Sequence, residues 1–176
     1  MDQTLDPVLS PAAYQAYLLA ALGSDDPATA QASTPARLRA VVADAGALLR
    51  VRPEPGEWSV IECLAHIVDG ELVSSARYRW IVAQDEPLLI GYDQDRWVDR
   101  LHADEDPEIL LGLFDGLRRA NLDLWARIPV DQRARIGRHQ ERGPESYDLT
   151  FRLLAGHDRI HLAQAQDALA AVRRSR

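Results

Sequence analysis

Signals for the start of a helix recur along this chain, whereas signals for β-strands do not. Ser10–Pro11 places a cap residue before a proline at the first helical position, which predicts a short helix over residues 11–22 that Gly23 ends. Thr34–Pro35 repeats this pattern and predicts the start of a second helix. Apolar residues then follow at three- and four-residue spacing, at Leu38, Val41, Val42, Ala45, Leu48 and Leu49. The polar residues 23–33 are predicted to form a linker.

Three longer helices are predicted downstream. Ser59 and Glu62 form a capping box at the start of the first, over residues 59–84. Asp106–Pro107 starts the next, which Pro129 ends, and residues 149–172 form the last. The connections between them are long, and a structured crossover is expected over residues 87–106.

Four long amphipathic helices predict an all-α four-helix bundle with an additional short N-terminal helix. The chain has 176 residues, a length that suits one domain. Within it, residues 1–33 are expected to form the short helix and linker, and residues 34–176 the bundle.

Composition excludes several functions. The chain has 20 basic and 27 acidic residues, a net charge of −7 and no dense basic cluster, so no nucleic-acid partner is expected. All basic residues are arginines, which excludes Schiff-base chemistry and a P-loop lysine. A single cysteine, and the lack of a signal peptide or an 18-residue apolar run, indicate a soluble cytoplasmic protein that does not bind membranes.

Three of the five histidines lie on predicted helices. His157 and His161 have the i, i+4 spacing that puts both side chains on one helical face, and His66 lies among apolar residues of another helix. Burying imidazoles in a bundle without hydrogen-bond partners costs free energy of folding. A divalent cation bound by the ring nitrogens removes that cost. Satisfied core histidines are the alternative. His102 and His139 fall in predicted loops, where solvated side chains are expected.

Two motifs carry a resemblance to a known family. The run GEWSVIECLAHIVDGE over residues 56–71 and the run GHDRIHLAQ over residues 156–164 resemble the DinB superfamily. The resemblance covers residues 36–172. It implies a four-helix bundle, often dimeric, that holds a divalent metal, zinc or nickel, between His66, His157 and His161. It also implies a small-molecule substrate, and similar proteins include S-transferases that use bacillithiol or mycothiol.

An ion with three protein nitrogens keeps positions open for water or substrate, which is typical of a catalytic site. Such an ion can activate a thiol or a water molecule. The ligand set does not choose between the two. With the family resemblance, we expect a metalloenzyme that activates a low-molecular-weight thiol or water against a small electrophile, of the thiol S-transferase type. The alternatives are a metal-dependent hydrolase, a bundle whose metal is only structural, and a bundle without metal.

Residues next to the three histidines have candidate roles. The run HDRIH over residues 157–161 has aspartate where the zincin motif HExxH has its catalytic glutamate, whose side chain is one methylene longer. Asp158 is therefore a candidate catalytic base. It could instead accept a hydrogen bond from a metal ligand, or be a solvated carboxylate. Asp69 either orients His66 or faces water. Gly70 leaves room either for a ligand or for a neighbouring helix. Cys63 is either a thiolate ligand or a small buried core residue, which we favour.

Aromatic residues outside the motifs suggest the mouth of a pocket. Tyr92, Trp97 and Tyr147 are candidates to line it, with Tyr92 in contact with a cofactor or substrate. Arg152 is a candidate to bind an anionic group of that ligand. Trp58, beside the capping box, is expected to have a structural role, filling space by packing. Packing is the commoner role of such aromatic residues, and solvation that of such an arginine.

Overall fold

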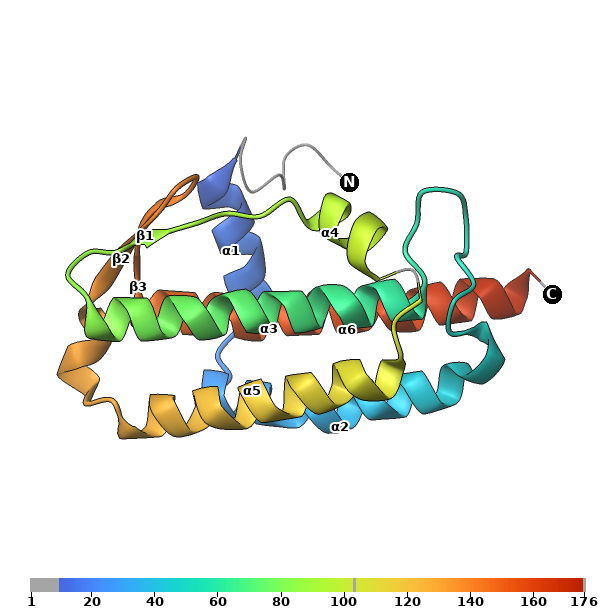
Figure 1. The fold of residues 1–176 in the computed structure, drawn as a ribbon, viewed down its shortest axis with the longest axis horizontal. Helices are drawn as coiled ribbons and strands as arrows, with labels where there is room; N and C mark the ends of the chain where they lie inside the picture. Colours follow the sequence, from blue (N-terminus) through green and yellow to red (C-terminus); the bar gives the residue numbers. More distant parts are fainter. Residues whose placement is uncertain (1–9, 103, 176) are drawn as a thin grey trace.

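A computed structural model describes residues 10–102 and 104–175. The long helices run along the length of the molecule, with most of the shorter elements on one side (Figure 1). The expected all-α four-helix bundle with a short N-terminal helix is confirmed. The long helices are α2 (Pro27–Ala45), α3 (Val60–Ala83), α5 (Pro107–Arg127) and α6 (Tyr147–Arg174).

Side-chain caps define where the long helices begin. At α3 the predicted capping box is present, and the Ser59 backbone N–H donates to Glu62 Oε2 at 2.8 Å. The Asp106 carboxylate caps α5 by accepting from the Glu108 backbone N–H at 2.9 Å. Ser146 caps α6 in the same way through Leu149, at 3.0 Å.

The prediction that α2 begins at Thr34 was wrong. The helix begins at Pro27, capped by Asp26, so residues 27–33 of the predicted linker are helical and position 33 lies in mid-helix. Pro35 has no N–H to donate to the carbonyl of Gln31, and Gln31 O instead accepts from Arg118 Nη1 at 2.8 Å. Because another helix satisfies this carbonyl, the proline does not end α2.

The connections contain structure that the sequence did not reveal. β1 (Leu88–Leu89) pairs in parallel with β2 (Ile136–His139), which pairs antiparallel with β3 (Gly143–Ser146). Strands of two to four residues are too short for apolar alternation to be recognised, which is why the sequence carries no strand signals. The predicted structured crossover is confirmed, because residues 87–106 contain β1 and α4 (Gln94–Leu101).

Two short 3-10 helices complete the connections. The first, η2 (Gly46–Leu48), follows α2 directly. The second, η3 (Val130–Ala134), lies between α5 and β2. None of the described helices is both long enough and apolar enough to cross a membrane.

A buried arginine joins the four long helices. Arg118 of α5 is 1% exposed, and its guanidinium donates to Glu71 of α3 and to Asp158 of α6, each at 2.7 Å. Its bond to Gln31 O adds α2. Apolar cores lie on both sides of this network, one around Phe114 and the other built of aromatic rings.

The short helix α1 (Pro11–Leu22) packs across α6, as Figure 1 shows. Gly156 is the contact point, because a Cβ atom there would lie 1.9 Å from the backbone oxygen of Leu18. Leu18 and Leu22 are buried. The close approach of the two backbones therefore requires glycine at this position.

We predict that Gly156→Ala destabilises the protein by about 1–3 kcal/mol, the cost of overpacking a close contact. Gly116 of α5 is the matched control, because nothing lies within 4 Å of a Cβ placed there. Gly116→Ala should leave stability unchanged or raise it by up to about 1 kcal/mol. Urea unfolding followed by circular dichroism measures both, and equal stability of the two variants would contradict this packing.

Candidate metal centre

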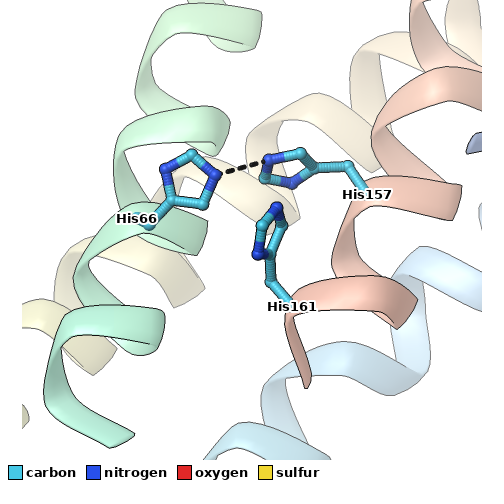
Figure 2. Close-up of side chains that lie close together, drawn as sticks. All are labelled: His66, His157 and His161. Carbon is cyan, nitrogen blue, oxygen red and sulfur yellow. Dashed lines mark hydrogen bonds between the residues drawn. The ribbon is translucent and has the colours of Figure 1, made fainter. Parts of the chain in front are cut away.

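Three histidine rings face one another between α3 and α6 (Figure 2). His66 comes from α3, and His157 and His161 come from successive turns of α6. One nitrogen of each ring can be chosen so that the three atoms lie within 4.8 Å of one another. The Nε2 atoms of His66 and His157 are 2.9 Å apart.

The backbone at Gly70 makes room for one of these rings. A Cβ atom on Gly70 would lie 3.1 Å from Cε1 of His157. Of the two explanations for this glycine, the structure supports close approach from another helix, here by the side chain of His157. The glycine therefore lets the ring reach across to His66.

Burial keeps the three rings neutral. His66 and His157 are 1% and 8% exposed, and their pKa values are lowered well below the usual range by burial and then by the neighbouring His161. The pKa of His161 is also lowered by burial, which outweighs a hydrogen bond between its Nδ1 and Gln164 Oε1 at 2.8 Å. A neutral imidazole keeps the lone pair that metal binding needs.

The donor set fits a divalent transition metal. Two facing Nε2 atoms 2.9 Å apart cannot both carry a proton, so at least one lone pair points into the space between the rings. The Nδ1 atoms of His66 and His157 are buried without a partner among the described residues. Three imidazoles suit zinc or nickel, whose bonds to nitrogen are about 2.0–2.1 Å for zinc.

The histidines border two hollows. His66 and His157 line a small cavity of about 90 Å³ that Tyr92 also lines. His161 lines a wider groove that passes Trp58. The ring of Trp58 packs against His66 with centroids 5.0 Å apart, and that of Tyr92 lies 6.5 Å from His66.

Comparison with known proteins now places the chain in a family. The model of the DinB superfamily matches residues 30–165, which is most of the chain. The chain belongs to the DinB superfamily. The family resemblance in the two histidine motifs is thus confirmed.

Curated relatives match the chain at low sequence identity. A protein of Bacillus cereus named "putative metal-dependent hydrolase" is 22% identical over 108 residues, which cover 61% of this chain and 62% of the relative. A protein of Oceanobacillus iheyensis with the same name is 24% identical, covering 65% of this chain and 66% of the relative. The chain thus spans just under two thirds of the length of these curated relatives.

A solved structure of the DinB type is similar over more of the chain. It is YfiT from Bacillus subtilis, described as "a probable metal-dependent hydrolase with an unusual four-helix bundle topology". The TM-score is 0.76 at 20% identity, and the match covers 85% of each chain. This likeness shows that the two proteins have the same fold.

The structure places the two candidate carboxylates away from the histidine rings. Asp158 follows His157 in α6, but its Oδ2 accepts from Arg118 and from the Thr34 hydroxyl at 2.9 Å. It is an ion-pair partner in the bundle rather than a solvated group. Asp69 was expected to orient His66 or to face water, and instead bonds His102 Nε2 at 2.7 Å.

Other candidates lie outside the cavity. Cys63 is fully buried in the apolar core, as favoured, and burial raises the pKa of its thiol to about 12. Tyr147 was expected at a pocket mouth but is buried against Phe151 and other aromatic rings. Arg152 is half-buried and pairs with Asp148 at 2.7 Å, and it is not among the residues that line the cavity.

The expectation of solvated side chains at His102 and His139 was wrong. His102 is 4% exposed and lies between the carboxylates of Asp69 and Glu105. Its pKa is lowered by burial but raised overall by these two carboxylates. His139 is 3% exposed and lines the cavity from β2.

Sequence reasoning also missed Arg77 as a cavity residue. The available signal was its spacing along α3. His66, Gly70, Ser74 and Arg77 follow a four, four, three pattern, which places all four on one face of the helix.

We predict that the histidines of the metal-free protein titrate in two groups. The pKa values of His66 and His157 are lowered well below 6.5 and that of His161 is lowered below it, so all three rings are mainly neutral at pH 6.5, whereas the raised pKa of His102 keeps its ring charged above that pH. Ring proton shifts measured by NMR from pH 4 to 9 follow all four in one sample. Titration of any cluster ring above pH 6.5 would contradict the burial described above, and His102 is the internal control.

Proposed function

We propose that this chain is a metal-dependent hydrolase in which His66, His157 and His161 hold a divalent ion, zinc or nickel. The observation that carries the proposal is the group of three neutral imidazoles, of which His66 and His157 line the cavity and His161 lines the neighbouring groove. The relatives named as metal-dependent hydrolases and the YfiT structure support it.

The chemistry follows from the ligand number. Three protein nitrogens leave coordination positions free, and a bound zinc ion acts as a Lewis acid and lowers the pKa of a coordinated water to about 7. The hollows beside His66, His157 and His161 are where a small substrate and water can approach.

The surrounding side chains position the ligands. Gln164 accepts from Nδ1 of His161, which leaves Nε2 of that ring with its lone pair. Trp58 packs against His66 and His161 and restricts ring movement. The backbone at Gly70 holds the His157 ring close to α3.

Transfer of a low-molecular-weight thiol such as bacillithiol or mycothiol would use the same three ligands. A metal that only supports the fold would use them as well. These functions differ in what turnover requires, so the experiment measures metal content first and then turnover with and without thiol.

We predict about one divalent ion per chain in protein purified without an affinity tag. His161→Ala should lose most of this metal, because only two imidazoles remain. His102→Gln is the matched control, since this histidine bonds carboxylates outside the cluster, and it should retain the metal. Elemental analysis of the three proteins decides this, and equal metal in His161→Ala and the wild type would overturn the ligand assignment.

Turnover is then tested on a panel of small esters and amides. Hydrolysis should occur without added thiol, stop on chelation and return with zinc or nickel. Turnover that requires bacillithiol or mycothiol would replace hydrolysis by thiol transfer. A fall in melting temperature on chelation, without turnover under any condition, would make the metal structural.

A further inference from the structure

The end of the cavity away from His66 and His157 is rich in hydrogen-bond donors. The cavity extends from His66 and His157 along α3 toward β2, which lies beside the carboxyl-terminal half of that helix (Figure 1). The polar side chains that line this end are those of Tyr14, Ser74, Arg77, His139, Arg142 and Thr150.

Arg77 is a buried cation without an ion-pair partner among the described residues. It is 7% exposed, its Nη2 donates to the backbone oxygen of Ile90 at 2.6 Å, and its Nε has no partner. No described carboxylate lies within ion-pair distance of it. A buried charge without a partner is costly, so a site of this kind favours an anionic ligand.

The second arginine at this end is already paired. Arg142 Nε and Nη2 donate to the two carboxylate oxygens of Glu145 at 2.6 and 3.0 Å. Glu141 also lines the cavity, but it is exposed and its carboxylate lies over Gly91. The buried charge that lines the cavity without an ion-pair partner is therefore that of Arg77.

His139 presents a second free donor. Its Nδ1 accepts the backbone N–H groups of Glu141 and Arg142 at 3.2 and 3.3 Å, so the proton of the neutral ring is on Nε2. Burial lowers the pKa of His139 to about 4, which keeps the ring neutral at pH 7. The Nε2 atom is buried and has no partner in the described part of the chain.

We propose that Arg77 and His139 bind the anionic oxygen group of a small substrate, a carboxylate or a phosphate, at the end of the cavity away from the metal. Arg77 supplies the charge and the Nε–H donor, and His139 supplies the Nε2–H donor. That this ligand is the substrate rests on the proposed function, whereas the anion site itself does not.

The spacing along α3 separates the anion site from the metal. Arg77 is eleven positions after His66 in α3, which corresponds to about 16 Å along the helix axis. Both side chains nevertheless line the same cavity. The anionic group is therefore a recognition handle, and the reacting bond lies elsewhere in the substrate.

The test uses isotope-labelled, metal-free full-length protein titrated with acetate and, separately, with inorganic phosphate. Sodium chloride at equal ionic strength is the control. The Nε–H resonance of Arg77 and the Nε2–H resonance of His139 should shift saturably with at least one of the two anions. The anion that binds more tightly identifies the group, and no saturable shift with either would overturn the proposal.

Matched variants locate the site. Arg77→Met keeps most of the apolar stem and should weaken anion binding at least tenfold. Arg138→Met removes the same charge from the exposed side of β2, where Arg138 pairs with Glu86, and should leave binding unchanged. Wild-type affinity in Arg77→Met would overturn the proposal, as would binding that requires the metal. The shift of the His139 resonance in the wild type provides the test that needs no variant.

Failure of this proposal is distinguishable from failure of the proposed function. Loss of anion binding in a protein that still binds metal and hydrolyses esters removes only the anion site. Saturable anion binding in a protein that holds no metal retains the anion site and removes the hydrolase.

Discussion

The buried guanidinium of Arg118 is the interaction on which the arrangement of the bundle depends. It bonds Glu71, which directly follows Gly70, and Asp158, which directly follows His157. The backbone of Gly70 lies against the His157 ring, so both carboxylates are next in sequence to residues at the histidine cluster. Removing one partner of a buried ion pair costs about 3–5 kcal/mol, so this network strongly favours one register of α3 against α6. The same register brings the rings of the cluster together.

The helices and the histidine cluster were predictable because their signals are local. The capping box at Ser59 and the i, i+4 spacing of His157 and His161 depend only on helix geometry, and both survive in the fold. Predicting that His66 meets His157 and His161 required more than local signals, because it depends on two amphipathic helices packing together. The family motifs supplied that information.

The features that sequence reasoning missed depend on contacts between distant segments. Pro35 was taken as a helix start because the partner of the Gln31 carbonyl, Arg118, is 87 residues away. Asp158 and Asp69 sit next to candidate ligands in sequence, but their bonds are to other helices or loops. The buried position of His139 likewise depends on a short sheet that leaves no readable pattern.

The central claim is that three imidazoles surround one metal ion. X-ray absorption spectroscopy at the edge of the bound metal measures this directly in the purified protein. The account predicts three imidazole nitrogens, at about 2.0–2.1 Å if the metal is zinc. A sulfur ligand at about 2.3 Å, which only Cys63 or the methionine could supply, or a first shell without imidazole, would contradict it.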